Sequence, residues 1–403
     1  MVIAGAGSGK TRVLTYRIAN LIRNNVDPFN ILALTFTNKA AKEMRERISQ
    51  LIGSEAHNLW MGTFHSIFSK ILRFESDKLN YPQNFTIYDS ADSKNLIKSI
   101  IKELNLDKEI YKANVILGRI SSLKNNLISY KSYISDSTLQ SEDANRKLNE
   151  MAMVYRTYQN RLFSSGSMDF DDLLFNTYIL LRDFPVALNK YQNKFKYILV
   201  DEYQDTNQVQ YMIVKRLAAM NENICVVGDD AQSIYAFGGG NIQNILNFKN
   251  DYPDFCTVKL EQNYRSTQTI VNAANSVIKH NKNQIEKNIF SKNDVGDIIK
   301  VCKTMSDNEE GQIVGQSIFE TQMNNKCFFN DFAILYRTNA QSRSLEESLR
   351  RRNIAYKIYG GLSFYQRKEV KDLLAYFRLL INPNDEESLK RIINYPARGI
   401  GIT

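Results

Sequence analysis

Short apolar runs bounded by turn residues recur along the chain and predict buried strands. They cover residues 31–36, 197–200, 224–227 and 257–260. Helix-period patterns lie between several of these runs. Strands that alternate with helices indicate a parallel sheet covered on both faces, so the pattern predicts the α/β class.

Residues 67–168 follow a different pattern, without strand-like runs. They are rich in Lys, Asn, Ser and Leu at helical spacing. One stripe in this stretch is apolar and carries interspersed lysines: Leu96, Ile97, Ile100, Ile101 and Leu104, with Lys94, Lys98 and Lys102. We interpret the stretch as a helical insertion between two strands of the first α/β domain, and we expect its lysines to form a solvated face rather than a DNA track.

A second α/β pattern starts near Glu261. Residues 298–302, 332–336 and 355–359 are predicted to be strands. Residues 266–281, 341–351 and 368–380 are predicted to be helices, and a short helix from Glu386 precedes Pro396. The order of these elements predicts a second domain of the same class.

A glycine-rich segment opens the chain and has the pattern of a phosphate-binding loop. Residues 4–11 read Ala-Gly-Ala-Gly-Ser-Gly-Lys-Thr. Glycines let backbone N–H groups point at phosphate oxygens, Lys10 is placed to reach the β- and γ-phosphates, and the Thr11 hydroxyl to face magnesium. The helix predicted over residues 11–24 adds its positive N-terminal end. The bland alternative is a glycine-rich turn that caps an ordinary helix.

The strand before this loop is represented only by Val2 and Ile3, which is short for a strand. We therefore expect the chain to be a fragment, with Met1 an internal methionine or a cloning start.

Two polar segments follow predicted strands and carry candidate chemistry. Asp201 and Glu202 come directly after residues 197–200, where Asp201 is placed to hold magnesium and Glu202 to take a proton from an attacking water. Gln232 follows residues 224–227 and is placed to contact the γ-phosphate or that water. The alternatives are a surface Asp-Glu pair and a polar turn.

Residues 262–266, Gln-Asn-Tyr-Arg-Ser, open the second α/β pattern. Arg265 is a candidate to approach the γ-phosphate and stabilise charge in phosphoryl transfer, and Tyr264 is a candidate to stack on a base. The alternative is a helix cap at Ser266 beside a surface arginine. Aromatic residues in polar loops, at residues 35–39, 62–66 and 235–237, suit stacking on single-stranded nucleic acid, although each taken singly is as well explained by a core.

Composition adds modest constraints. The 403 residues have a multi-domain length, and the 43% hydrophobic content lets each domain bury a core. A net charge of +9 fits a polyanionic partner without proving one. No Cys-x-x-Cys pair indicates zinc or a disulfide frame, and no apolar run of about 18 residues predicts a membrane span. We expect a soluble intracellular protein.

Taken together, these segments resemble the UvrD/Rep/PcrA group of superfamily 1 DNA helicases over essentially the whole chain. Residues 4–11 look like motif I, 35–41 like motif Ia, 62–66 like motif Ib, 200–207 like motif II, 227–235 like motif III and 260–266 like motif IV. Residues 336–343 and 359–364 also match the second motor domain of that group. The order of the motifs makes the resemblance far more specific than any one of them.

The resemblance implies RecA-like, parallel-sheet P-loop NTPase domains with a helical insertion. Domain 1A comprises residues 1–66 and 169–260, insertion 1B residues 67–168, an incomplete domain 2A residues 261–380, and the start of domain 2B residues 381–403. It also implies an ATP- and Mg²⁺-dependent motor that moves 3′ to 5′ on single-stranded DNA and acts at duplex junctions. We expect repair or replication proteins as partners and a cytoplasmic, nucleoid-associated location in a bacterium.

The resemblance assigns roles residue by residue. The catalytic set is Lys10, Asp201, Glu202, Gln232 and Arg265. The nucleotide-binding set is Ala4, Gly5, Ala6, Gly7, Ser8, Gly9, Lys10 and Thr11, with Arg12 and Tyr264 flanking adenine. Thr11 and Asp201 are the metal-binding residues. The DNA-facing set is Phe36, Thr37, Asn38, Thr63, His65, Tyr235, Phe237 and Asn339.

Three departures from the family pattern limit these expectations. The adenine-reading glutamine segment of the family precedes motif I, and motifs V and VI follow domain 2B, so we expect an incomplete motor. Residues 237–240 read Phe-Gly-Gly-Gly where the family commonly has Trp-Arg-Gly-Ala, which removes a cation that supports DNA binding. The rival interpretations are a nucleotide-dependent DNA-binding module that does not unwind, and the motor part of a RecB- or AddA-like helicase-nuclease.

Overall fold

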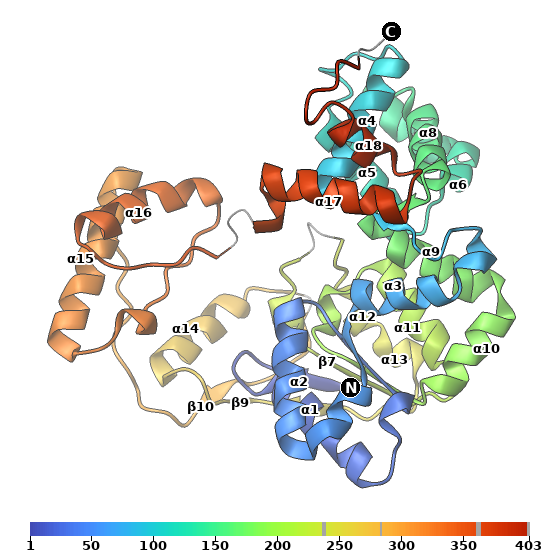
Figure 1. Cartoon of the computed structure of the whole chain (residues 1–403). Helices are drawn as coiled ribbons and strands as arrows, with labels where there is room; N and C mark the ends of the chain where they lie inside the picture. The colour runs from blue at the N-terminus through green and yellow to red at the C-terminus, as the bar shows by residue number, and fades with distance from the viewer. Residues whose placement is uncertain (236–238, 283, 360–363, 401–403) are drawn as a thin grey trace. The chain divides into compact units, whose positions relative to one another are not determined.

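A parallel six-stranded sheet lies at the centre of the larger part of the molecule (Figure 1). The computed structural model describes residues 1–235, 239–282, 284–359 and 364–400. Across the sheet the strands are β3 (Trp60–Thr63), β2 (Ile31–Thr35), β6 (Tyr197–Val200), β7 (Ile224–Gly228), β1 (Val2–Ala4) and β8 (Val258–Leu260). Each pairing in this sheet is parallel, which confirms the α/β class and the four strands predicted in this half of the chain.

Alternate residues of each strand face opposite sides of the sheet, as the two-residue period of a strand requires. In β2, Leu32 and Leu34 pack into one core, while Ile31 and Ala33 pack into another. Both faces are therefore apolar, which explains why the strands are continuous hydrophobic runs instead of alternating ones.

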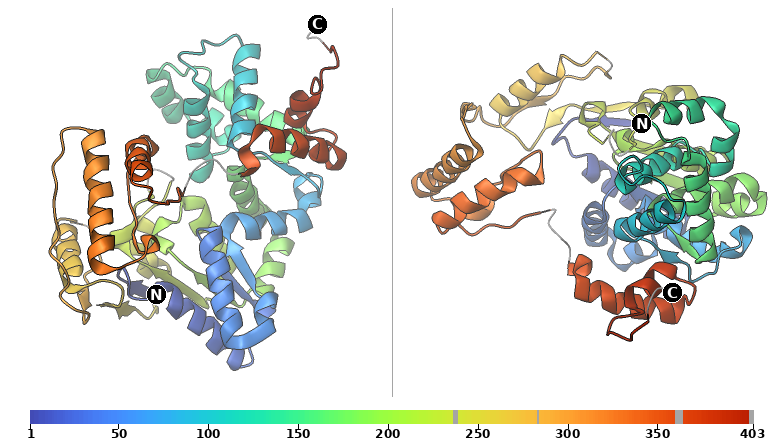
Figure 2. Two further views of the ribbon diagram at one scale, coloured as in Figure 1. Left: turned by 60° about the vertical axis from the view of Figure 1, so that its left-hand side comes forward. Right: turned by 90° about the horizontal axis from the view of Figure 1, so that it is seen from above.

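Helices cover both faces of the sheet (Figure 2). One core joins the sheet to α1 (Lys10–Arg23) and α2 (Asn38–Ile52), through residues such as Leu14, Ile18 and Met44. The other core joins it to a larger group: α3 (Phe64–Phe74), α9 (Phe170–Asp183), α10 (Pro185–Lys194), α11 (Gln208–Ala218), α12 (Gln243–Leu246) and α13 (Phe248–Asp251). Because all strand pairings of the sheet are parallel, the carboxyl ends of the strands lie at one edge of the sheet, where ligands bind in such folds.

The predicted helical insertion has its own core, separate from the cores of the sheet. Its helices are α4 (Ser90–Glu103), α5 (Ala113–Asn125), α6 (Tyr130–Ser135), α7 (Ser137–Asn145) and α8 (Met151–Ser164). The stripe of Leu96, Ile97, Ile100 and Ile101 is buried in that core, as its spacing predicts. One detail was missed, because two-residue strands give no periodic signal: β4 (Thr86–Ile87) pairs in parallel with β5 (Ser167–Met168).

The last helices of the chain pack on this insertion. The structure divides into two units, one of Met1–Gly296 with Asp372–Thr403 and one of Asp297–Lys371. Helix α17 (Lys368–Ile381) ends near Asn382, whose side chain donates hydrogen bonds to Thr86 Oγ1 (3.0 Å) and to the Ser165 carbonyl (2.9 Å). At the start of α18 (Glu386–Ile392), buried Asp385 accepts a hydrogen bond from Tyr88 (3.0 Å). Short polar side chains thus anchor this segment.

The stretch after β8 contains the predicted helix and one short pair of strands that was not predicted. Its elements in the larger unit are β9 (Gln262–Asn263), α14 (Gln268–Ile278) and β10 (Phe290–Ser291), and β9 pairs with β10 in parallel. In the smaller unit, α15 (Asp307–Asn325) packs on α16 (Ser342–Arg351). The predicted helices over residues 266–281, 341–351, 368–380 and after Glu386 are all present, with shifts of a few residues at their ends.

The prediction of strands at residues 298–302, 332–336 and 355–359 is wrong. These segments belong to no sheet ladder among the described residues. Their apolar side chains do not gather in a core, since Val301 and Leu335 are each 93% exposed. An apolar run becomes a strand only when a neighbour takes up its backbone hydrogen bonds, and the described part of the chain supplies none here.

Among the helices of the described residues, none combines the length and the apolar character needed to cross a bilayer.

Candidate nucleotide site

The glycine-rich loop connects β1 to α1 at the carboxyl edge of the sheet. Gly7 (φ 68°) and Gly9 (φ 93°) have left-handed backbone conformations that disfavour side chains. A Cβ on Gly7 would lie 2.8 Å from both Arg265 Cβ and Asn263 Nδ2, so the close approach of another segment also requires glycine. Ser8 closes the loop by donating from its hydroxyl to the Gly5 carbonyl (2.7 Å). The loop therefore keeps its backbone open toward a cavity.

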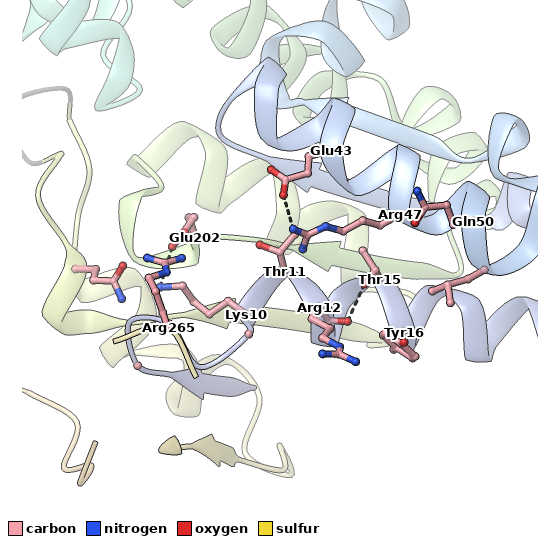
Figure 3. A pocket seen from close by; sticks show the side chains of 15 residues that line it. Lys10, Thr11, Arg12, Thr15, Tyr16, Glu43, Arg47, Gln50, Glu202 and Arg265 are labelled. Atoms are coloured by element: carbon pink, nitrogen blue, oxygen red, sulfur yellow. Dashed lines mark hydrogen bonds and ion pairs between the residues drawn. The ribbon is translucent and has the colours of Figure 1, made fainter. Parts of the chain in front are cut away.

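Lys10 starts α1 and faces this cavity of about 690 Å³ (Figure 3). Its side chain is only 10% exposed, and its Nζ lies 3.5 Å from Glu202 Oε2. At that distance the contact is an ion pair without a hydrogen bond, and Nζ has no hydrogen-bond partner in the part of the chain that the structure describes. A buried ammonium group with its donors unused is costly, so it marks a place for an anion.

Asp201 and Glu202 follow β6 at the same edge, as the sequence predicts. Asp201 is buried, and its Oδ1 accepts a hydrogen bond from the Glu202 N–H (3.0 Å). Burial and the neighbouring Glu202 charge raise the pKa of Asp201 to about 7. Glu202 has a left-handed backbone (φ 48°), which is uncommon for glutamate and turns its side chain into the cavity.

Gln232 also lines the cavity, from the turn after β7. Its Nε2 donates to Asp229 Oδ2 (2.6 Å), which fixes the orientation of the amide. A second glutamine links this turn to β6: Gln204 donates to Glu202 Oε2 (2.9 Å) and accepts from the Asp229 N–H (3.0 Å). The two turns that carry Glu202 and Gln232 are thus joined by one buried side chain.

Arg265 reaches the cavity from the segment after β9. Asn263 holds this segment against the glycine-rich loop. Its Nδ2 donates to the Ala6 carbonyl (2.7 Å), and its Oδ1 accepts from the N–H of Arg265 (2.8 Å). Tyr264 donates its backbone N–H to the Gly7 carbonyl (3.0 Å), and its side chain is 66% exposed. The N-cap position of α14 is Thr267, not Ser266, and its side chain makes no capping hydrogen bond. Arg265 itself lines the cavity, which the helix-cap alternative does not explain.

The remaining wall of the cavity comes from α1 and α2. Thr11, Arg12 and Tyr16 lie on α1, and the Arg12 guanidinium carbon lies 5.5 Å from the centre of the Tyr16 ring. Glu43 and Arg47, which form an ion pair on α2, also line the cavity and lie on the side of Thr11 (Figure 3). The cavity thus runs from a cationic end at Lys10 and Arg265 to a polar groove between two helices, a shape that fits a phosphate chain joined to a larger polar group.

The residues predicted to face DNA are brought together only in part. The rings of Phe36 and Tyr235 lie 5.5 Å apart, and the His65 ring lies 5.8 Å from the Phe170 ring. Burial lowers the pKa of His65, which favours its neutral form. Thr35, just before Phe36, has a buried hydroxyl with no hydrogen-bond partner among the described residues.

Other members of that predicted set have a visible structural role or lie elsewhere. Thr37 and Thr63 cap α2 and α3 by accepting the N–H of Ala40 (3.1 Å) and Ser66 (3.3 Å). Asn38 is exposed at the first turn of α2. Asn339 belongs to the smaller unit, and Phe237 lies outside the described residues.

Sequence reasoning missed three residues that shape the site: Gln204, Asn263 and Lys287. Gln204 and Asn263 stood inside recognised motifs, yet side-chain amides carry no pattern that says which turn they will bridge. Lys287 lies in a polar stretch without periodicity, and only the structure brings it to Asp229 and Asp230.

The parallel sheet, the loop at its carboxyl edge and the buried lysine together define a RecA-like P-loop protein. Family comparison narrows this class. A model of the UvrD/REP helicase N-terminal domain matches residues 1–253, and a model of the UvrD-like helicase C-terminal domain matches residues 258–403. The chain belongs to the UvrD/REP helicase family.

Individual relatives agree with this assignment. The ATP-dependent DNA helicase PcrA of Staphylococcus epidermidis is 49% identical over 407 residues, which cover 100% of this chain and 54% of that protein. The ATP-dependent DNA helicase PcrA of Staphylococcus aureus is 48% identical over 402 residues, again 100% of this chain and 54% of the relative. The chain therefore spans about half the length of the curated relatives it matches.

Proposed function

We propose that this chain is the nucleotide-binding part of an ATP-dependent helicase that moves 3′ to 5′ along single-stranded DNA and opens duplex junctions. The observation that carries the proposal is the buried Lys10 ammonium group, which faces an open cavity with its donors unused. Relatives named as ATP-dependent DNA helicases support the choice of ligand and substrate.

The chemistry we propose for the site is phosphoryl transfer from ATP to water. Lys10 and Arg265 neutralise charge on the terminal phosphates, which is the main catalytic need of this reaction. Glu202 is 34% exposed and is the carboxylate placed to accept a proton from the attacking water. Gln232 orients that water or contacts the γ-phosphate, and Arg12 and Tyr264 flank the base.

Magnesium fits the residues present. Asp201 is a carboxyl group whose raised pKa reflects burial beside a second carboxylate, and a nearby cation would favour its charged form. Among the described residues, no group of three His, Cys, Asp or Glu side chains could hold a metal ion by itself. Mg²⁺ is usually bound by only one or two protein carboxylates, together with water and substrate phosphates. We propose Asp201 and Thr11 as the protein groups that hold it and thereby stabilise charge on the phosphates.

For the DNA path we propose the edge near Phe36 and Tyr235, with His65 and Phe170 as a second aromatic pair. Aromatic rings at such an edge offer stacking surfaces that tolerate any base. Thr37, Asn38, Thr63, Phe237 and Asn339 remain proposed DNA contacts.

We also propose a domain assignment. Residues 67–168 act as insertion 1B, and residues 1–66 with 169–260, 261–380 and 381–403 correspond to domains 1A, 2A and 2B. Cytoplasmic, nucleoid-bound DNA is the proposed setting, with repair or replication proteins as partners.

The test is phosphate release from magnesium ATP by this chain, with and without single-stranded DNA. We expect release that DNA stimulates and that Lys10→Ala abolishes. Lys98→Ala, at an exposed lysine of α4, serves as the matched control and should leave release unchanged. Release that persists in Lys10→Ala, or the absence of any release with both ligands present, would contradict the proposal.

A further inference from the structure

Residues 285–290 form a strap that follows α14 and runs into β10, and it contacts two parts of the nucleotide site. At one end, Ile289 packs on the glycine-rich loop so closely that a Cβ on Gly5 would lie 2.2 Å from Ile289 Cδ1. At the other end, the Ile285 N–H donates to Asp230 Oδ2 (2.8 Å). The strap is held between these points by the Asn288 N–H, which donates to Glu261 Oε1 (2.8 Å).

Lys287 projects from the middle of this strap into the turn that carries Gln232. Its Nζ lies 2.5 Å from Asp230 Oδ1 and 2.9 Å from Asp229 Oδ1, and its side chain is only 7% exposed. Asp229 uses its other oxygen, Oδ2, to accept from Gln232 Nε2 (2.6 Å). One carboxylate is therefore shared between the buried lysine and the glutamine of the cavity.

The charges explain why the lysine is needed there. Asp229 and Asp230 are adjacent and nearly inaccessible to water, so their repulsion is weakly screened. Burial by itself lowers the pKa of Lys287, but the two carboxylates outweigh burial and raise the pKa above its ordinary value. Without the ammonium group, the two carboxylates must separate or admit water, and each of these changes moves the acceptor that fixes Gln232.

We propose that Lys287 is a positioning residue for Gln232. Through the ion pairs of Lys287 with Asp229 and Asp230, the strap of residues 285–290 holds the Gln232 side chain in its place in the wall of the cavity. The consequence for ATP turnover rests on the proposed function, whereas the consequence for the turn does not. Lys287 touches no substrate in this scheme, and its influence passes through the Asp229 carboxylate.

The first test measures amide hydrogen exchange of residues 228–233 in the whole chain. Lys287→Met should accelerate exchange there by about tenfold, while Lys287→Arg, whose fork can bridge both carboxylates, should restore most of the protection. Lys292→Met, at an exposed lysine of the same region, is the matched control and should change nothing. Unchanged exchange in Lys287→Met overturns the proposal whether or not the chain hydrolyses ATP.

The second test is a double-mutant cycle on ATP turnover with Lys287→Met and Gln232→Ala. A misplaced Gln232 should lower kcat by about tenfold to a hundredfold and change KM for ATP less than about threefold, because Lys10 and the loop are untouched. In the Gln232→Ala background, Lys287→Met should have no further effect on kcat. Fully additive losses would overturn the positioning role, whereas a wild-type chain that fails to turn over ATP contradicts the proposed function and leaves the exchange result to decide this inference.

Discussion

Two buried lysines in this molecule have opposite surroundings. Lys124, in helix α5 of the insertion, is 1% exposed and lies 2.7 Å from Asp169 Oδ2 and 2.8 Å from Asp172 Oδ1. Lys10, at the glycine-rich loop, has one ion pair at 3.5 Å and no hydrogen bond among the described residues. The first lysine is satisfied within the protein, and the second is left for a ligand.

The difference separates a structural charge from a functional one without reference to any relative. A buried charge that is paired and hydrogen-bonded contributes to the fold, and its removal strands its partners. A buried charge with unused donors is a cost to the folded state that a bound anion offsets. Substitutions at the two lysines should therefore produce opposite patterns of lost stability and lost activity.

The largest effect should come from Lys124→Met. The substitution leaves Asp169 and Asp172 buried without their cation, which should lower the free energy of unfolding by about 3–5 kcal/mol. Chemical denaturation of the whole chain measures this loss, and the exposed Lys98→Met should stay within about 0.5 kcal/mol of wild type. A loss below about 1 kcal/mol in Lys124→Met would break the comparison.

Lys10→Met should show the reverse pattern. Loss of the cation that faces the phosphates should reduce ATP turnover by at least about a hundredfold, or about 2.7 kcal/mol of transition-state stabilisation. The free energy of unfolding should be unchanged or up to about 1 kcal/mol higher, because no hydrogen bond is lost. Measuring both quantities on one preparation makes the test, and a variant that is destabilised as strongly as Lys124→Met would show that Lys10 is structural.

The pH dependence of stability should report the crowded carboxylates around Lys124. Burial and the charge of Asp169 raise the pKa of Asp172 to about 7, against the counteracting pull of Lys124. Because this folded-state pKa lies above that of an unfolded aspartate, about 4, the stabilising contribution is present at low pH and is lost as pH rises toward 7. Asp169, whose pKa Lys124 lowers against the effect of burial, titrates below this window.

Denaturation at pH 5, 6 and 7 should therefore show wild type losing about 1 kcal/mol per pH unit relative to Asp172→Asn, which does not titrate. Parallel pH profiles for the two proteins would mean that Lys124 holds both carboxylates in their charged form.

Thr35→Val should have the smallest effect on stability. Its hydroxyl is buried without a hydrogen-bond partner among the described residues, so an apolar group of the same shape should raise the free energy of unfolding by zero to about 1 kcal/mol. If Thr35 instead contributes to the proposed DNA path, single-stranded DNA should bind more weakly to the variant in a fluorescence titration. A marked loss of stability would show that the hydroxyl is paired in solution.

The sheet and its covering helices could be predicted from the sequence because their signals are local. The predicted strand 197–200 has the same bounds as β6, and the apolar stripe around Ile97 and Ile100 is buried, as its helical period requires. The predictions at residues 298–302 and 332–336 failed because a strand depends on a neighbour that no local pattern specifies. The pair of β4 with β5 was missed because strands of two residues give no periodic signal.

The residues of the candidate site were predictable where a motif requires one type of side chain for one chemical role. Lys10, Glu202, Gln232 and Arg265 do line a single cavity, although they come from four separate segments. The supporting side chains were not predictable, because each contacts a turn that is distant in sequence. Asn263 binds the loop at Ala6, and Lys287 binds the turn at Asp230. Such contacts follow from tertiary geometry, and amide and ammonium groups of the same kind are common on any surface.

The most direct test of the account is calorimetric titration of magnesium ATP into this chain and into Lys10→Met. If Lys10 marks the triphosphate site, binding to the wild-type chain should be saturable and the affinity of the variant should be at least about tenfold lower, equivalent to about 1.4 kcal/mol or more. Equal affinity in the two proteins, or no binding to either, would contradict the claim that the unpartnered lysine marks the triphosphate site.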